Sequence, residues 1–169
     1  MEFKFLRASE DDIDSVVNST KAVITFFEKK LTADEAERRI LSAYHRIKAS
    51  IHLYTVIKLL GRKIGHFCFR EQDGVMIIED LWISDGYRGM GAGTRALEKC
   101  ISETELPIRA VVHARNYFAL SLFRNNGFQM TERTSDDHCV LEYPNTVPFN
   151  RDDHVCYDPL TDYASGKGK

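Results

Sequence analysis

The alternation of apolar and polar residues predicts a chain in which short strands and helices follow one another. Phe3 and Phe5 alternate with charged neighbours and indicate a first strand. The serine and acids of "SEDDID", from Ser9, supply an N-cap and an acidic first turn. We therefore expect a helix from about Glu10 to about Thr20.

A second helix and three further strands are predicted in the middle of the chain. Thr32 and Glu35 have the spacing of a capping box, and apolar residues then recur at helical intervals. Strand-like patterns follow over Ile51 to Leu59, from Ile64, and over Val75 to Ser84. "GRK", from Gly61, marks the first turn between them, and the dipeptide Asp73-Gly74 is typical of a hairpin.

The second half alternates helices with strands. A helix from Thr94 to about Ser102 precedes "LPIRAVVHA", a nearly continuous apolar strand of the kind found at the centre of a buried sheet. Asn116 then begins a helix that Gly127 ends in a C-cap position. Two strands follow, at about 128–133 and 138–143. We therefore expect one domain over residues 1–143 and a polar tail, extended or disordered, over residues 144–169.

Composition narrows the function classes. The 169 residues are 43% hydrophobic and 28% charged, with a formal net charge of -2, as in a soluble globular protein without attraction to nucleic acid or anionic membranes. No apolar run has membrane-spanning length, and the first residues lack the pattern of a secretory signal. The four cysteines contain no C-x-x-C pair, and "DDHVC", Asp152 to Cys156, lacks partner ligands elsewhere. We expect a reduced, cytoplasmic chain without a metal.

The stretch "YRGMGAGTRALEKC", Tyr87 to Cys100, places three glycines between a strand and a helix. Free backbone amides and the positive end of a helix dipole at one place attract phosphate. The dinucleotide fingerprint fails because it would need a glycine at Thr94, and no Walker lysine follows. The alternative is a glycine-rich start of a helix that binds no ligand.

The spacing Arg88-x-x-Gly91-x-Gly93 resembles the (Q/R)-x-x-G-x-(G/A) acetyl-CoA loop of the GNAT superfamily of N-acetyltransferases. "IEDLWIS" before it resembles the family's fourth strand, in its polyamine-type form, and "NYFALSLFRNNGF" resembles its last helix. The resemblance covers residues 3 to 143 and is most specific from Ile77 to Phe128. It implies an α/β, GNAT-like acyl-CoA N-acyltransferase fold, with a mixed, mostly antiparallel sheet that is split at the cofactor and flanked by helices on both faces.

The resemblance also implies how acetyl-CoA would bind as the cosubstrate. Backbone amides would hold its pyrophosphate along the loop of Arg88, Gly89, Met90, Gly91, Ala92, Gly93 and Thr94. Its pantetheine arm would lie between the fourth and fifth strands, in contact with Asn116, which is also a helix N-cap candidate. An amide near Leu81, Trp82 and Ile83, where the family strand bulges, would polarise the thioester carbonyl. The indole of Trp82 forms either the pocket wall or the core, and we favour the core.

Acetylation of an amine requires a group that takes the amine's proton, because a primary amine is protonated at neutral pH. Glu79 and Asp80 are the candidates, and strand alternation would send them to opposite faces. By the resemblance Glu79 is the first candidate for the base, acting through water. Asp80 is the second candidate for the base or an anion that binds the amine, and the alternative is that it only pairs with a basic side chain. His113, at a strand end, is an alternative base or a structural residue.

The last helix departs from the family pattern because Phe123 stands where a tyrosine usually protonates the leaving thiolate. The predicted function is acetyl transfer to a primary amine of a cationic acceptor, with a small polyamine-like molecule favoured. The alternatives are a catalytically weak acyl-CoA-binding or regulatory protein, and an enzyme whose acceptor is a protein or an RNA. Pairing through a late strand, common among similar folds, would give a homodimer.

Overall fold

The computed structural model describes residues 1–144, so the predicted tail beyond Pro144 and its "DDHVC" segment lie outside the described residues. Seven strands are present in this range: β1 Phe3–Arg7, β2 Tyr54–Leu59, β3 Arg62–Gln72, β4 Val75–Ile83, β5 Ile108–His113, β6 Gln129–Arg133 and β7 His138–Tyr143. The α-helices are α1 Ile13–Phe27, α2 Ala33–Ser50, α3 Ala92–Ser102 and α4 Tyr117–Asn125. Short 3-10 turns occupy Glu10–Asp12, Ile51–Leu53 and Asp85–Tyr87.

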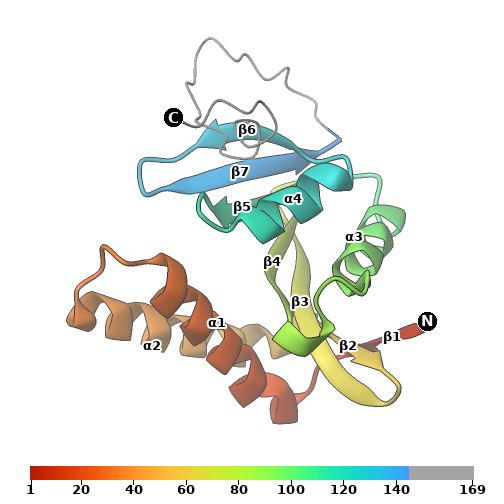
Figure 1. Cartoon of the computed structure of the whole chain (residues 1–169), viewed down its shortest axis with the longest axis horizontal. Coiled ribbons are helices and arrows are strands. Elements are labelled where there is room, and N and C mark those ends of the chain that lie inside the picture. Colours follow the sequence, from red (N-terminus) through yellow and green to blue (C-terminus); the bar gives the residue numbers. More distant parts are fainter. Residues whose placement is uncertain (145–169) are drawn as a thin grey trace, which may run out of the picture.

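The strands form one sheet in the order β1-β2-β3-β4-β5-β7-β6 (Figure 1). Every neighbouring pair is antiparallel except β4 and β5, which are parallel and are joined through α3. The predicted mixed, mostly antiparallel sheet is confirmed.

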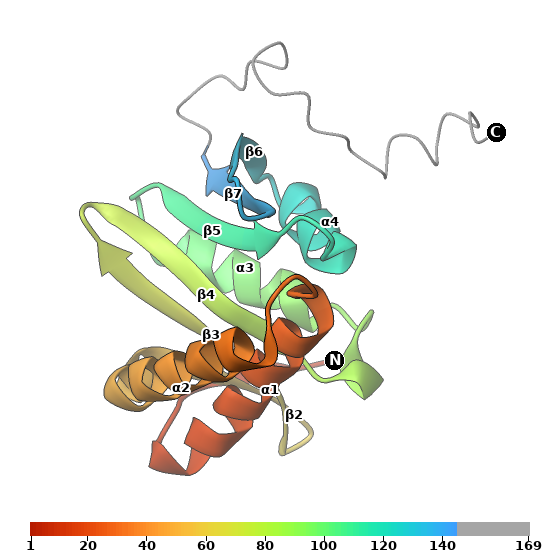
Figure 2. The same cartoon turned by 90° about the vertical axis from the view of Figure 1, so that its left-hand side faces the viewer.

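Helices cover both faces of the sheet, as expected (Figure 2). One core cluster contains Ala96, Leu97 and Cys100 of α3 and Phe123 of α4, packed on strands from β2 to β7. The second cluster lies on the other face, where Val16 of α1 and Ile47 of α2 pack on β2 and β3. Burial of these apolar side chains is the main force that holds each helix pair to the sheet.

Local signals in the sequence explain several element boundaries. The Thr32–Glu35 capping box and the Asn116 cap of α4 are both present. Asp73 and Gly74 have φ values of 52° and 77°, the left-handed pair that a two-residue hairpin turn requires. Gly127, with a φ of 90°, follows the end of α4 as predicted.

The first helix is longer than predicted: α1 ends at Phe27, whereas the sequence pattern suggested Thr20. Residues 23–25 are β-branched and favour a helix only weakly, so their conformation depends on packing. A buried contact fixes the helix on the sheet, because the Ser19 hydroxyl lies 2.9 Å from Nε2 of His66 on β3. Burial lowers the pKa of His66 to about 4, so this imidazole stays neutral.

The expectation that β5 has the burial of a strand at the centre of a buried sheet is correct for one face only. Ile108, Ala110 and Val112 are buried under α3 and α4, but Val111, on the opposite face, is 56% exposed. The reason is that α1 and α2 pack over β2 and β3 and leave this face of β5 largely uncovered (Figure 1).

The parallel strands β4 and β5 separate after a short contact. Their pairing runs only from Met76 with Ile108 to Ile78 with Ala110. Beyond this point β4 continues to Ile83 and β5 to His113 without pairing to each other. The sheet is therefore split at the predicted place.

Candidate active site

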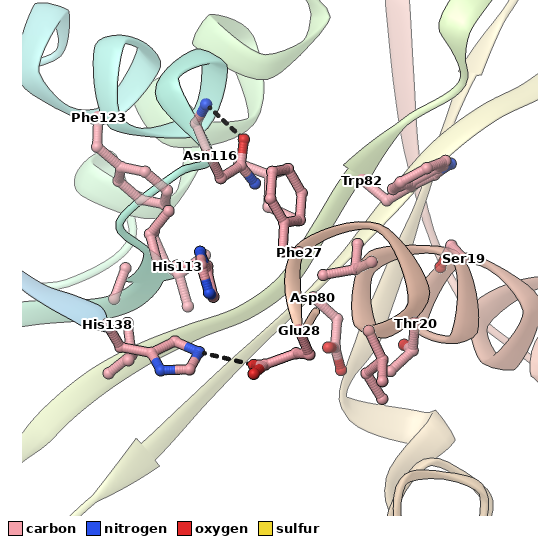
Figure 3. A pocket seen from close by; sticks show the side chains of 18 residues that line it. Ser19, Thr20, Phe27, Glu28, Asp80, Trp82, His113, Asn116, Phe123 and His138 are labelled. Atoms are coloured by element: carbon pink, nitrogen blue, oxygen red, sulfur yellow. Dashed lines mark hydrogen bonds and ion pairs between the residues drawn. The ribbon is translucent and has the colours of Figure 1, made fainter. Parts of the chain in front are cut away.

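A cavity of about 170 Å³ occupies the split between β4 and β5. Its walls come from both strands, from one side of α1, from the start and middle of α4, and from His138 of β7 (Figure 3). Apolar side chains such as Val23, Phe27 and Val111 form much of the lining, and the carboxylates of Glu28 and Asp80 face the same space. A concave, mostly apolar site with a few polar groups is typical of a small-molecule site.

A β-bulge in β4 places the acids differently from the sequence expectation. His66 pairs with Trp82 and Cys68 pairs with Glu79, so two residues of β4 lie opposite the single residue between His66 and Cys68. Asp80 is in this bulge, with a left-handed φ of 51°. The bulge interrupts the alternation of side chains, and the expectation that Glu79 and Asp80 point to opposite faces is wrong. Both approach the same nitrogen, Nη1 of Arg46.

The two acids nevertheless differ in what they can still bind. Both carboxylate oxygens of Glu79 are occupied, because Arg70 binds them at 3.1 Å and 2.9 Å, and Glu79 does not line the cavity. Asp80 uses only Oδ2, which lies 3.0 Å from Arg46 and 2.5 Å from the Tyr54 hydroxyl. Within residues 1–144, Oδ1 of Asp80 has no hydrogen-bond partner, and the side chain lines the cavity.

Tyr54 and Arg46 hold Asp80 in place from the buried side. The Tyr54 side chain is 1% exposed, and its hydroxyl accepts a hydrogen bond from Arg46 at 3.1 Å while it donates to Asp80. Burial first, and the Asp80 charge second, raise the pKa of Tyr54 above its usual value. Tyr54 is therefore a permanent donor that fixes the orientation of the carboxylate.

The far end of the cavity contains functional candidates that sequence reasoning missed. Glu28, at the end of α1, lies 3.3 Å from Nε2 of His138 and 3.2 Å from Arg39. His113 packs edge-on against His138 with ring centroids 5.1 Å apart, and stacks on Phe27. Glu28 was missed because α1 was expected to end at Thr20. His138 had a detectable signal, since antiparallel pairing of the strands sets it opposite His113.

Trp82 connects the cavity to the glycine loop. The expectation that it belongs to the core is wrong, because it is absent from both buried clusters and lines the cavity. Arg88 stacks on its indole at 4.9 Å, donates to the Ile83 carbonyl and pairs with Asp85. The Arg88 side chain thus stiffens the turn between the bulged strand and the loop.

The glycine loop presents open backbone. Gly89 and Gly91 have φ values of 75° and 86°, and a Cβ added to either would meet nothing within 4 Å. Gly91 is the N-cap of α3 and offers no side-chain cap, and among the described residues the amides from Gly89 to Thr94 have no hydrogen-bond acceptor. The loop therefore has both the space and the unsatisfied donors that a phosphate group requires.

A model of the acetyltransferase (GNAT) family matches residues 20–128, about two thirds of the chain. The protein belongs to the GNAT family. Its reaction class is therefore acetyl-CoA-dependent N-acetyl transfer. The match spans the bulged strand, the glycine loop and α4, which are the three segments that carried the resemblance in sequence.

Solved structures show the same fold. The PaiA N-acetyltransferase from Thermoplasma acidophilum, in complex with coenzyme A, is 16% identical, with a TM-score of 0.66, and the match covers 84% of this chain and 98% of that one. The N-acetylglutamate synthase from Neisseria gonorrhoeae, complexed with coenzyme A and L-arginine, is 14% identical, with a TM-score of 0.59, over 83% of this chain and 32% of that one. No curated protein matches the chain.

The remaining GNAT-derived positions are distributed between the loop and the cavity. Asn116, the N-cap of α4, and Phe123 within α4 line the cavity, as do Leu81 and Trp82 of β4. Gly93 serves helix packing, because a Cβ there would lie 2.7 Å from Leu122 of α4. The others belong to the loop or its flanks and do not line the cavity: Ile83, Arg88, Gly89, Met90, Gly91, Ala92 and Thr94.

Over residues 1–144, no group of three or more His, Cys, Asp or Glu side chains is arranged to hold a metal ion. None of the helices in that range has both the length and the apolar character needed to cross a membrane.

Proposed function

We propose that the protein transfers the acetyl group of acetyl-CoA to the primary amine of a small acceptor bound in the cavity, by direct attack within a ternary complex. The observation that carries this proposal is the continuity of the site. Arg88 of the loop stacks on Trp82, which lines the cavity in the split sheet, where Oδ1 of Asp80 is available to a ligand.

The loop amides from Gly89 to Thr94 would hold the pyrophosphate of acetyl-CoA, and the cosubstrate supplies a thioester as the acetyl donor. Gly89 and Gly91 leave room for the phosphates. The bulge at Asp80 supports the expected amide of the following residues as the group that polarises the carbonyl oxygen. Asn116 and Phe123 would contact the arm that passes between β4 and β5.

We assign Asp80, and not Glu79, as the group that accepts the amine's proton. Geometry favours this order because Oδ1 of Asp80 is available in the cavity, whereas Arg70 occupies both oxygens of Glu79. As the amine nitrogen bonds to the carbonyl carbon and the carbon–sulfur bond breaks, the proton moves to Asp80 directly or through one water.

The charged side chains that line the cavity limit which acceptors can bind. The cavity lining contains two carboxylates and, within residues 1–144, no lysine or arginine. An acceptor that carries a carboxylate or phosphate would find no fixed cation there, so we propose an amine without an anionic group. The acid pair Glu79 and Asp80 favoured a cationic acceptor, and the polyamine-type resemblance of "IEDLWIS" favoured a polyamine among cationic acceptors. Arg46 and Arg70 neutralise the acid pair, which removes the first of these two reasons.

Turnover of small amines tests this function. We expect release of free coenzyme A thiol from acetyl-CoA when primary amines with an uncharged tail, or diamines, are added. Amino acids carry a carboxylate and should give little release. The measurement is the initial rate of thiol release, followed with a thiol reagent for each amine of a matched panel. Tight acetyl-CoA binding without turnover of any amine would instead favour the binding-protein alternative, and release only with protein or RNA would favour a macromolecular acceptor.

A tyrosine at position 123 is expected to raise kcat. Phe123 is 3% exposed, packs edge-on against Phe128 and lines the cavity, but has no hydroxyl with which to protonate the leaving thiolate. General acid catalysis contributes about a hundredfold to ten-thousandfold, and a thiolate is already a tolerable leaving group, so a gain of about tenfold is expected for Phe123→Tyr. Pre-steady-state kinetics measures it, and an unchanged or lower kcat with intact folding would contradict the missing-acid account.

A further inference from the structure

His113 carries a ring nitrogen that the proposed acetyl transfer does not use. The side chain is 7% exposed and lines the cavity. Its Nδ1 accepts a hydrogen bond from the backbone N–H of Arg115 at 3.1 Å. Because that nitrogen must be unprotonated to accept, a neutral ring carries its proton on Nε2. Burial lowers the pKa of His113, although the nearby Glu28 charge opposes this, and so favours the neutral ring.

Nε2 of His113 is therefore a hydrogen-bond donor at the far end of the cavity. In the part of the chain that the structure describes, the hydrogen bond of the His113 ring is at Nδ1, and no fully buried side-chain nitrogen lacks a partner, so Nε2 is open to the cavity. A donor that opens into a mostly apolar cavity can bind an acceptor atom of a ligand held there.

Glu28 provides the complementary acceptor. His138 and Arg39 both approach its Oε1 atom, at 3.3 Å and 3.2 Å. The other nitrogen of His138 faces only acceptors, the carbonyl of Asp136 at 3.0 Å and its carboxylate at 3.4 Å. No hydrogen bond within residues 1–144 reaches Oε2 of Glu28, and the side chain faces the cavity (Figure 3).

The negative charge of Glu28 is already paired with a cation, and this affects which ligand groups it can bind. Arg39 is a permanent cation, and its Nη1 lies 3.2 Å from Oε1 of Glu28. A second ammonium group would gain little from Glu28 under these conditions and would leave Nε2 of His113 without an acceptor. A neutral group that both accepts and donates satisfies both atoms.

We propose that His113 and Glu28 are specificity-determining residues that bind a hydroxyl group at the far end of the acceptor, which makes amino alcohols the preferred substrate class. The hydroxyl oxygen accepts a hydrogen bond from Nε2 of His113, and the hydroxyl group donates a hydrogen bond to Oε2 of Glu28. This inference rests on the proposed function, since the amine end is placed at Asp80.

Matched acceptors test the assignment. The series compares linear 1-amino-ω-alcohols, α,ω-diamines and 1-aminoalkanes of two to six carbons, by kcat/KM from thiol release. At the best chain length we expect the ratio of kcat/KM for the amino alcohol to kcat/KM for the alkylamine to be about tenfold to a hundredfold. Glu28→Gln, in which the amide nitrogen can replace Oε2, and His113→Phe, which keeps the ring on Phe27, should bring this ratio close to one.

The control is Asp14→Asn, which removes an exposed carboxylate from the same helix outside the cavity and should keep the wild-type ratio. A diamine preferred over the alcohol, a wild-type ratio near one, or a ratio that survives both cavity substitutions would overturn the inference while leaving acetyl transfer intact.

Failure of the proposed function gives a different result, namely no turnover of any amine. NMR of the histidine ring protons in the coenzyme A complex then tests the inference independently. The alcohol series should shift the His113 ring signal and the alkylamines should not. Equal shifts, or none, would overturn the assignment.

Discussion

Replacing Asp80 by asparagine is expected to lower kcat/KM for amine acetylation by about a hundredfold to ten-thousandfold, the usual contribution of a positioned proton acceptor. Asparagine has nearly the same shape and can still accept hydrogen bonds from Tyr54 and Arg46. What it loses is the charge at Oδ1, which is the oxygen available to a ligand in the cavity. Affinity for acetyl-CoA, held mainly at the loop, should change little.

Glu79→Gln is the matched comparison for this experiment. It removes one charge from the adjacent position of the same strand, but from a carboxylate whose oxygens Arg70 already occupies. We expect a much smaller loss of kcat/KM. Steady-state kinetics on both variants, with circular dichroism to confirm folding, measures the difference. A large loss in Glu79→Gln with a small one in Asp80→Asn would restore Glu79 as the base and contradict our assignment.

Local signals made much of this site predictable from sequence. The Thr32–Glu35 capping box, the Asp73-Gly74 turn and the Asn116 cap each depend on residues within a few positions of one another, so their conformations follow from local chemistry. The glycine loop is of the same kind, because Gly89 and Gly91 adopt left-handed φ values that other residues disfavour.

Non-local contacts account for what could not be predicted. The bulge at Asp80 depends on β3, where a Cβ at Gly65 would lie 2.3 Å from the Trp82 carbonyl oxygen, so only glycine allows β3 so close to the bulged strand. Strand alternation, which assumes a regular ladder, therefore failed at the one place where it was used to assign the acids.

The far end of the cavity was missed for a related reason. The end of α1 and the residues just after it are held by contacts distant in sequence, since Arg115 donates to the Phe27 carbonyl at 2.8 Å and Lys30 pairs with Asp137 at 2.7 Å. These contacts bring Glu28 beside His138, a neighbourhood that no local pattern specifies. The net charge around Glu79 and Asp80 was also misjudged from the sequence, because the arginines that neutralise these two acids come from other elements, α2 and β3.

The second large effect is expected at the loop, where Gly91→Asp should abolish measurable binding of acetyl-CoA. Gly91 has a φ of 86°, which aspartate adopts only with strain, and its side chain would enter the open space over the loop. Loss of two charge-assisted hydrogen bonds to phosphate corresponds to about 3 to 6 kcal/mol, or roughly a hundredfold to ten-thousandfold in Kd. Charge repulsion adds to this loss.

Gly74→Asp is the matched control, because Gly74 has a similar φ of 77°, is equally open, and lies in the hairpin at the opposite end of β4. It carries the same added charge and a comparable strain away from the loop. Thermal unfolding of both variants verifies that each domain remains folded.

Calorimetric titration of acetyl-CoA into the wild type, Gly91→Asp and Gly74→Asp tests the central claim, that the open amides between Gly89 and Thr94 anchor the acetyl donor. We predict binding to the wild type and the control, and none to folded Gly91→Asp. Wild-type affinity in Gly91→Asp would contradict the claim and, with it, the roles assigned along the cavity.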